Sequence, residues 1–219
     1  EEFSDVVGFW ADMEHPYITY ENDFIESEWW ALKEIWKKGL LYQGHKIVPY
    51  CPRCGTPLSS HEVAQGYKDV TERSAIVRFK AADEDAYFLA WTTTPWTLPS
   101  NLGLCVNPSV TYVKVRVYGK VYYLAEALMD SVFADSWGDR EILATMKGSD
   151  LEYRKYEPLY AFADKDVQDK AFFVICDDYV TTEDGTGIVH TAPAFGEDDN
   201  RVCRKYGMPF VQFVNDKGE

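Results

Sequence analysis

The sequence has 219 residues, of which 46% are hydrophobic and 16% aromatic, and its formal net charge is −14. This length suffices for one large domain, or for one domain and part of another, with ample apolar residues for a packed core. The acidic balance argues against broad, sequence-independent binding of nucleic acid, but it allows a local pocket for one short strand. With neither the ~18–20 continuous apolar residues of a membrane span nor a secretory leader, we expect no membrane partner.

Residues 1–48 form a first block that is dominated by one predicted helix. In the stretch NDFIESEWWALKEIWKKG, residues 22–39, apolar side chains repeat at helical spacing: Ile25, Trp29, Leu32 and Trp36. Asn22 or Asp23 is predicted to cap the start of this helix, and Gly39 marks its end. We expect the tryptophan-rich stripe to be a core or domain-interface surface.

Residues 49–60, PYCPRCGTPLSS, form a knuckle built on Cys51 and Cys54. A structural zinc ion takes four Cys or His ligands, commonly from two such knuckles, and the sequence has no second CxxC. A lone reduced pair is one alternative. A redox pair is another, although the residues after Cys54 do not start a helix convincingly. We favour half of a zinc site, with its other ligands outside this chain.

The other three cysteines stand singly in apolar or helical contexts: Cys105, Cys176 and Cys203. We expect them to be reduced, buried thiols rather than partners in disulfides. This cysteine usage fits a reducing compartment and predicts a cytoplasmic protein.

From about residue 66 the sequence reads as short strands separated by Gly, Pro, Asp and Asn. Five segments have the length and the β-branched or aromatic content of strands: SAIVRF, AYFLAWTT, TYVKVRV, KVYYLA and AFFVIC. Two segments, AEALMDSVFAD and GEDDNRVCRKYG, read as helices between them. Short strands with few helices predict an α+β fold in which a β-barrel-like domain carries peripheral helices.

The stretch WTTTPWTLPSN, residues 91–101, lies at the end of one predicted strand. Side chains alternate along a strand, so Thr92 and Thr94 share a face while Thr93 points away. The proline that follows ends the pairing and holds Thr94 extended. On spacing alone, a threonine-rich strand end is the favoured interpretation. The alternative is a pair of hydroxyls fixed between Trp walls, with the amide of Asn101 beside them.

A second polar cluster lies in DGTGIVHTAPAFGEDD, residues 184–199. GIVHT reads as a short strand with His190 near its end, and Asp199 lies in the first turn of the next helix. A lone His at a strand end is typically structural, and a carboxylate in a first helical turn typically complements the helix dipole. The short link nevertheless directs both side chains to one loop-lined mouth. There an imidazole can transfer a proton and a carboxylate can bind an ammonium group.

Together, WTTTPWTLPSN and GTGIVHTAPAFGEDD closely resemble the two signature stretches of the editing domain of isoleucyl-tRNA synthetases. YCPRCGTPLSSHEVAQGYKDV resembles the zinc-knuckle entry to that domain, and residues 7–50 resemble the catalytic-domain segment that leads into it. Valyl and leucyl editing domains typically carry Arg after two threonines, whereas Thr94 is followed here by Pro95 and Trp96. This detail favours the isoleucyl family. The resemblance weakens across residues 118–170.

The resemblance implies a division of the chain into three parts. Residues 1–48 would lead out of a Rossmann-type catalytic domain, residues 49–60 would be the zinc-knuckle half-site, and residues 61–219 would be the editing domain, cut short at its end. The two ATP-dependent activation motifs of class I synthetases, HIGH-like and KMSKS-like, are absent. We therefore expect no amino-acid activation from this chain, and ATP binding only in the full-length ligase.

The function implied is post-transfer editing, the hydrolysis of the ester that links a misplaced valine to the 3′ end of tRNA(Ile). The partners implied are this tRNA end, the small amino acid and the rest of the synthetase chain. One alternative is a valyl-type editing domain that clears threonine. Another is a non-catalytic module that binds zinc and tRNA ends.

The resemblance also implies roles for individual residues. Asp199 would bind the α-ammonium group, and His190 would lie at the amino-acid or ribose end of the pocket. The threonines would orient the ester and the attacking water: Thr92, Thr93 and Thr94. Trp91 and Asn101 would contact the substrate. Editing itself would need no cofactor, and zinc is expected only at the two knuckle cysteines, Cys51 and Cys54.

Overall fold

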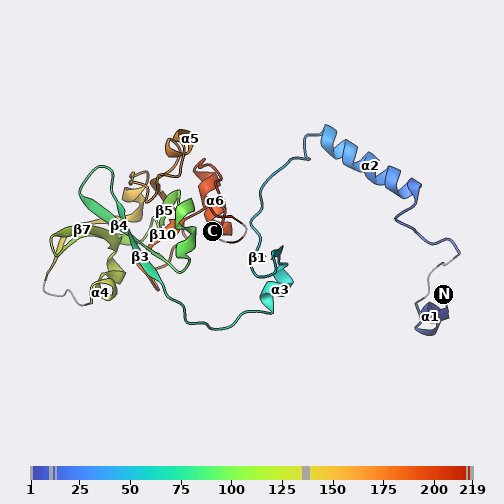
Figure 1. Ribbon diagram of the computed structural model, residues 1–219, viewed down its shortest axis with the longest axis horizontal. Coiled ribbons are helices and arrows are strands. Elements are labelled where there is room, and N and C mark those ends of the chain that lie inside the picture. The colour runs from blue at the N-terminus through green and yellow to red at the C-terminus, as the bar shows by residue number, and fades with distance from the viewer. Residues whose placement is uncertain (1, 10–11, 13, 135–138, 216, 218–219) are drawn as a thin grey trace. The chain divides into compact units, whose positions relative to one another are not determined.

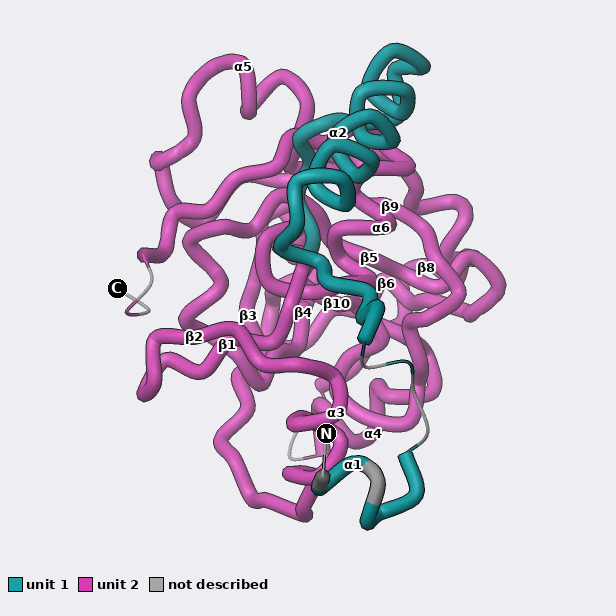
Figure 2. Tube along the Cα trace, turned by 90° about the vertical axis from the view of Figure 1, so that its right-hand side faces the viewer, with its two compact units in different colours: residues 1–46 teal, residues 47–219 magenta. Residues whose placement is uncertain are grey.

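A computed structural model describes residues 2–9, 12, 14–134, 139–215 and 217. The chain divides into two compact units, Glu1–Lys46 and Ile47–Glu219 (Figure 2). The three-part division predicted from the sequence, with boundaries after residues 48 and 60, stays a prediction. No described helix is long and apolar enough to cross a membrane.

The first unit contains the helices α1 (Glu2–Val6) and α2 (Asn22–Lys37). The second of them confirms the helix predicted from the apolar spacing. The predicted cap is wrong, because Glu21 occupies the N-cap position without a side-chain cap bond and Asn22 is already helical. Gly39 ends the helix in the left-handed region, at φ 68°, and its N–H donates to the Trp36 carbonyl at 2.8 Å.

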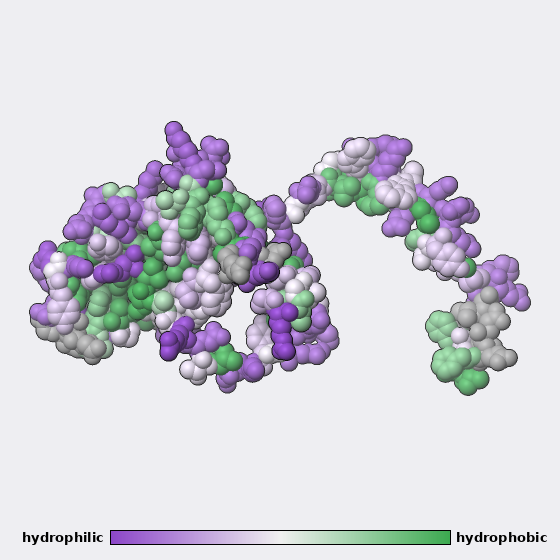
Figure 3. All heavy atoms as spheres, viewed as in Figure 1, coloured by the Kyte–Doolittle hydropathy of each residue, from purple (hydrophilic) through white to green (hydrophobic). Residues whose placement is uncertain are grey.

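The apolar stripe of α2 has no core to pack against within its own unit. None of the described residues of this helix is buried, and Trp29 and Trp36 are each 67% exposed. Figure 3 shows hydrophobic side chains on the surface of this helix. A 16-residue helix without tertiary packing is marginal in water. That the stripe forms a core or domain interface stays a prediction.

The second unit begins with the cysteine knuckle. Strands β1 (Tyr50–Cys51) and β2 (Thr56–Pro57) pair antiparallel across it. Helix α3 (Ser60–Ala64) follows, and a capping box of Ser59 and Glu62 fixes its start.

Eight strands form the main sheet, in the order β8-β6-β7-β4-β10-β5-β9, with β3 paired to β4. Their bounds are β3 Ala75–Lys80, β4 Ala86–Thr92, β5 Gly103–Val106, β6 Thr111–Val117, β7 Lys120–Ala125, β8 Arg140–Lys147, β9 Phe173–Cys176 and β10 Ile188–Thr191. The five predicted strand segments and GIVHT are confirmed. Two strands, β5 and β8, were not predicted.

The helices of this unit are short and lie at the periphery of the sheet (Figure 1). Besides α3, the described helices are η1 (Pro95–Ser100), η2 (Glu126–Leu128), α4 (Met129–Val132), η4 (Gly148–Leu151), α5 (Lys165–Gln168) and α6 (Glu197–Lys205). The predicted helix AEALMDSVFAD becomes η2 and α4, and its last residue, Asp135, lies outside the described residues. The α+β fold with peripheral helices is confirmed.

Residues 153–157 close the sheet into a barrel. On one side, the Tyr156 N–H donates to the Phe172 carbonyl at 3.0 Å, next to β9. On the other side, the Glu157 N–H donates to the Lys80 carbonyl at 2.8 Å, at the end of β3. The ring therefore runs β3, β4, β10, β5, β9 and back to β3 through this segment. The closure involves only the end of β3, at Lys80 and the residues just after it.

The side chain of Arg154 stabilises this closure. Its guanidinium lies 2.7 Å from a Glu84 oxygen and 2.8 Å from an Asp83 oxygen, and 4.9 Å from the centroid of the Tyr123 ring. Although burial raises the pKa of Glu84, hydrogen bonds from Lys114, Tyr123 and Arg154 lower it to about 2. The segment that completes the barrel is thus held by side chains as well as by backbone pairing.

The core fills the interior of this barrel. Its largest fully buried side chains are Tyr112, Tyr123, Phe79, Phe88, Leu102 and Leu104. Phe88 and Tyr123 stack with ring centroids 5.0 Å apart. Full burial of one such side chain contributes about 1.5–3 kcal/mol. The result is a rigid frame from which the loops at the strand ends project.

Candidate functional site at the ends of β4 and β10

Two parallel strands bring the two signature stretches together. Strands β4 and β10 run parallel and pair at Trp91 and Val189, so the residues that follow both strands leave the sheet at the same end. Strand β5 runs antiparallel to β10, with Leu104 opposite His190. Asn101, which precedes β5, therefore reaches the same end. The two distant stretches meet because of this topology.

The threonine hydroxyls form a short chain at this end. Thr92 Oγ1 accepts the Thr94 N–H at 3.0 Å and lies 3.3 Å from Thr94 Oγ1. Thr94 Oγ1 in turn lies 3.5 Å from Thr97 Oγ1. Thr93 is exposed, but it follows the end of β4 at Thr92, so strand alternation does not extend to it. Thr94, whose hydroxyl lies between those of Thr92 and Thr97, is exposed as well.

His190 extends this row of hydrogen-bonded hydroxyls into the protein interior. Its Nε2 lies 2.8 Å from Thr97 Oγ1, and its Nδ1 lies 3.0 Å from Asn101 Nδ2. Thr97 Oγ1 donates to the Thr94 carbonyl at 2.8 Å, so it accepts from the imidazole. His190 therefore carries its proton on Nε2 and uses Nδ1 as an acceptor.

The orientation of Asn101 is fixed by its other contacts. Its Nδ2 donates to the Gly103 carbonyl at 2.9 Å, and its Oδ1 accepts the Tyr156 hydroxyl at 2.6 Å. If the Asn101 amide were flipped, its oxygen would face the Gly103 carbonyl oxygen, and two acceptors would meet without a proton between them. The amide thus determines the tautomer of His190, and Tyr156, on the closing segment of the barrel, determines the orientation of the amide.

This network keeps His190 neutral. The side chain is only 6% exposed, and burial lowers the pKa of the imidazole from 6.5 to about 4. Both ring nitrogens are already hydrogen-bonded. The imidazole is consequently a poor proton acceptor in this arrangement, and it serves better as a fixed wall or a donor.

Asp199 lies in the first turn of α6, but its carboxylate does not cap that helix. Its Oδ2 accepts the N–H of Ala192 at 3.0 Å, just after β10. Gly196 leaves the space for it, because a Cβ there would lie 3.0 Å from the Asp199 Cγ. The side chain is thereby held beside the same strand end as His190.

The charge of Asp199 has no cationic partner in the described part of the chain. Its neighbour Asp198 pairs with Arg201, and no ion pair is formed by Asp199 itself among the described residues. Burial raises the pKa of the Asp199 carboxyl to about 6, although the Ala192 N–H lowers it. A half-buried carboxylate without a counter-ion carries a desolvation cost. A ligand with a positive group would compensate it.

Trp91 directly precedes Thr92 in β4, so its side chain lies on the opposite face of the strand from that of Thr92. It is half-buried, and Gly185 packs directly against its indole, where a Cβ would lie 2.8 Å from the ring. Gly185 also adopts φ 75°, which favours glycine. The loop before β10 can therefore approach the indole closely only with glycine at this position.

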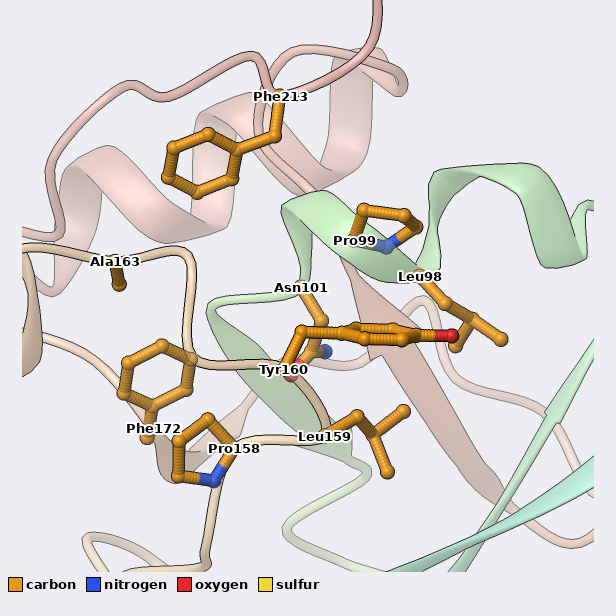
Figure 4. Close-up of a pocket in the computed structure, with 9 residues that line it drawn as sticks. All are labelled: Leu98, Pro99, Asn101, Pro158, Leu159, Tyr160, Ala163, Phe172 and Phe213. Atoms are coloured by element: carbon orange, nitrogen blue, oxygen red, sulfur yellow. The ribbon is translucent and has the colours of Figure 1, made fainter. Parts of the chain in front are cut away.

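A small pocket adjoins the network at Asn101 (Figure 4). Its walls are largely aromatic and proline side chains: Pro99, Pro158, Tyr160, Phe172 and Phe213. Asn101 belongs both to this pocket and to the network of His190.

The knuckle cysteines have the local geometry of a metal-binding hairpin. The Cys54 N–H points to Cys51 Sγ at 3.4 Å, and the Gly55 N–H donates to the Cys51 carbonyl at 2.8 Å. The bond from Cys54 lowers the pKa of the Cys51 thiol. No group of three potential metal ligands occurs among the described residues. Two ligands fit half of a zinc site.

The three remaining cysteines are free and buried, as predicted. Burial raises the pKa of Cys105 and Cys203 to about 12 and that of Cys176 to about 11. They are inert core residues near neutral pH.

Two residues of the network were not predicted. Thr97 lies within the quoted stretch, three residues after Thr94, but its partner His190 is 93 positions away. Tyr156 lies 55 positions from Asn101 in a region without a recognisable motif. For Thr97, the turn signal of the two flanking prolines was available in the sequence.

Comparison with known proteins decides the family. A family model described as tRNA synthetases class I (I, L, M and V) matches residues 2–191. The chain belongs to the class I tRNA synthetase family. The resemblance expected from the signature stretches is confirmed, since this synthetase chain is similar to curated isoleucine–tRNA ligases.

One such relative of this synthetase chain, from Clostridium tetani, is 55% identical over 220 residues, which is 100% of the chain and 21% of the relative. Another, from the archaeon Picrophilus torridus, is 50% identical over 215 residues, or 98% of the chain and 20% of the relative. The chain thus spans about a fifth of the length of the curated relatives it matches.

Among solved structures, the chain is similar to the editing domain of the cytosolic leucyl-tRNA synthetase of P. knowlesi. The two are 16% identical with a TM-score of 0.49, over 66% of this chain and 70% of that one.

Proposed function

We propose that this chain edits tRNA after aminoacylation, by hydrolysing the ester of valine mistakenly attached to tRNA(Ile). The observation that carries the proposal is Asp199, a half-buried carboxylate without a cationic partner in the described chain, at the same strand end as the hydroxyls of Thr92 and Thr94. A carboxylate binds an α-ammonium group by charge-assisted hydrogen bonds. Hydroxyls nearby can hold an ester and a water.

The need for such a reaction follows from the two substrates. Isoleucine and valine differ by one methylene, a difference known for isoleucyl-tRNA synthetase itself to be worth only about 1–3 kcal/mol in a hydrophobic pocket. A second site that admits valine and hydrolyses its ester corrects the error. The similarity to isoleucine–tRNA ligases supports valine as the amino acid, and tRNA(Ile) and the remaining synthetase chain as partners in the cytoplasm.

The hydrolysis proceeds by direct attack of water. Water adds to the ester carbonyl carbon, the bond to the ribose oxygen breaks, and that oxygen takes the proton, which yields valine and free tRNA. Asp199 holds the ammonium group, and the Thr94 hydroxyl hydrogen-bonds the carbonyl oxygen or the water. His190 does not act as the base, since its pKa is about 4 and both nitrogens are bonded.

The test uses a short oligonucleotide that ends in valyl-adenosine, so that tRNA contacts elsewhere in a longer enzyme are not needed. We expect the full chain to hydrolyse the valyl ester faster than the isoleucyl ester. Equal rates for both esters contradict editing of valine. Faster hydrolysis of a threonyl ester supports a valyl-type domain, and binding without hydrolysis supports a non-catalytic module.

The threonines provide a matched pair of variants. Thr92→Val removes a hydroxyl that accepts the Thr94 N–H, and we expect it to lower kcat/KM about tenfold or more. Thr93→Val makes the same substitution at an exposed threonine, and we expect it to change kcat/KM less than about twofold. The opposite order would contradict the role of the shared hydroxyl face.

We also propose that Cys51 and Cys54 supply half of a structural zinc site in the longer protein. Zinc there would hold the knuckle in shape and is not required for the hydrolysis. Cys51→Ser should lower the zinc content of the longer protein by one equivalent, measured by elemental analysis. Unchanged zinc content would remove these cysteines from the site.

A further inference from the structure

Tyr156 places a buried hydroxyl against the amide of Asn101. Its side chain is only 2% exposed, and its hydroxyl donates to Asn101 Oδ1 at 2.6 Å. Burial raises the pKa of this hydroxyl well above its usual range, so the group keeps its proton and remains a donor. A buried amide oxygen without a donor is costly, and a phenylalanine ring could not supply one.

The barrel closure holds this hydroxyl in a fixed position. The backbone of Tyr156 pairs with Ala81 on one side, and its N–H donates to the Phe172 carbonyl on the other, at 3.0 Å. The ring lies edge-on to the rings of Phe79 and Phe172, with centroids 5.3 and 6.1 Å away. Backbone and ring are both constrained, so the hydroxyl is a rigid support for the group that it contacts.

Asn101 uses its whole amide in this arrangement. Its oxygen accepts from Tyr156, and its nitrogen donates to the Gly103 carbonyl at 2.9 Å and to His190 Nδ1 at 3.0 Å. The two ends of the amide are thus held by separate partners. Because the nitrogen donates to Nδ1, the proton of the neutral imidazole stays on Nε2.

The hydrogen bonds that follow all point in the same direction. His190 Nε2 donates to Thr97 Oγ1 at 2.8 Å, and Thr97 Oγ1 donates to the Thr94 carbonyl at 2.8 Å. The other tautomer of His190 would leave Nε2 as an acceptor and draw the Thr97 proton away from Thr94. The state of the amide therefore affects the turn at residues 94–97, whose Thr94 hydroxyl lies 3.3 Å from that of Thr92.

We propose that Tyr156 is a positioning residue for the hydrolysis: acting through Asn101, its hydroxyl keeps His190 in the Nε2–H form and so holds the turn at residues 94–97 in place. The inference rests on the proposed function, in which the Thr94 hydroxyl hydrogen-bonds the ester carbonyl or the water. Tyr156 itself does not touch the reacting atoms. The ammonium group is bound elsewhere, by Asp199, so loss of the Tyr156 hydroxyl should act on kcat rather than on KM.

The experiment compares the full chain with its Tyr156→Phe variant. The imidazole nitrogen signals of His190, assigned with a His190→Gln sample, are recorded by NMR near pH ~7, where the ring is neutral. In the unsubstituted chain, Nε2 should be the protonated nitrogen. In the variant the amide turns more freely, so the second tautomer becomes populated and the two signals move toward each other. With the valyl oligonucleotide, kcat should fall about three- to tenfold, while KM changes less than about twofold.

The matched control is Tyr112→Phe. Tyr112 is also fully buried, but its hydroxyl donates to the Gly187 carbonyl, at 2.6 Å. This variant should leave the His190 signals and kcat in place. Unchanged His190 signals in Tyr156→Phe overturn the inference, whatever the kinetics show. A proton on Nδ1 in the unsubstituted chain overturns it as well, without any variant.

A double variant separates positioning from a general loosening of the barrel. In Asn101→Ala the Tyr156 hydroxyl has lost its acceptor, so the addition of Tyr156→Phe should move neither the His190 signals nor kcat any further. A further shift of the signals would show that Tyr156 reaches His190 by another route, against the inference. If the unsubstituted chain hydrolyses no ester, the proposed function fails, while the His190 signals still decide whether Tyr156 sets the tautomer.

Discussion

At Asp199, the feature that suits ligand binding also weakens the fold. The pKa of its carboxyl is about 6 in the folded chain, against 3.8 for an exposed Asp, which corresponds to about 3 kcal/mol. Since the folded state holds the proton more tightly, this stability is complete below pH ~4 and is lost as the pH rises through ~6. At neutral pH the fold therefore carries an uncompensated charge.

Asp199→Asn should separate the effect of this carboxylate on ligand binding from its effect on the stability of the fold. The amide oxygen can still accept the Ala192 N–H, but no charge is buried. We expect the free energy of unfolding near pH ~7.5 to rise by about 1–3 kcal/mol, with no gain below pH ~4, and hydrolysis of the valyl ester to be lost. Urea unfolding at both pH values checks the first part. A destabilised variant at neutral pH would contradict the buried-charge argument.

His190 should not control the pH dependence of hydrolysis. Its pKa of about 4 lies below that of Asp199, so the acid limb of the profile should fall near pH ~6 and belong to the carboxylate. In His190→Gln, the side-chain amide can donate to Thr97 as Nε2 does now. We expect this variant to keep the position of the acid limb while the rate changes. A limb that moves or disappears would make His190 the titrating group.

At the scale of elements, the tight contact between Gly196 and Asp199 offers a test of placement. An added Cβ would lie 3.0 Å from Cγ and 3.1 Å from Oδ2 of Asp199. Gly196→Ala should push the carboxylate away from Ala192 and raise KM for the valyl ester about tenfold, at little cost in helix capping. Steady-state kinetics measures this directly.

Gly66→Ala is the control for this substitution, since a Cβ there makes only an ordinary contact, 3.5 Å from the Val63 carbonyl oxygen. It should leave KM unchanged. Equal KM values in the two variants would show that the geometry at Gly196 does not govern the site.

The strands that the sequence predicts have alternating or strongly β-branched patterns, whereas the two that it does not predict show no alternation. Strand β5, GLCV, is buried at all four positions and begins with glycine, so no alternation marks it. Strand β8 is exposed at most positions and shows no two-residue period. Residues 153–157 close the barrel by backbone bonds to two strands distant in sequence, for which no local signal exists.

The residues of the site also divide into those with a local sequence signal and those without one. Thr92, His190 and Asp199 could be predicted because they lie in long signature stretches. Tyr156 could not, because it acts only through Asn101, which the tertiary fold brings to it. Spacing alone favoured a capping role for Asp199, and the structure shows its side chain bound to the Ala192 N–H instead. Whether these residues perform editing stays a prediction.

At the scale of the whole molecule, the burial of apolar side chains is confined to one part of the chain. Every buried hydrophobic residue in the described part lies at Phe79 or later. By contrast, no described residue of α2 is buried. The buried hydrophobic residues of the described chain therefore all lie in the second unit, residues 47–219.

Removal of residues 1–46 should consequently leave the second unit folded. We expect the chain of residues 47–219 to unfold in one cooperative transition within about 3 °C of the full chain, because it contains all the buried hydrophobic residues of the described chain. Circular dichroism and calorimetry measure this. Phe79→Ala, which empties a fully buried core position, should lower stability by about 3–5 kcal/mol and shows that the assay detects core loss. A comparable drop on removal of residues 1–46 would show instead that the first unit stabilises the barrel.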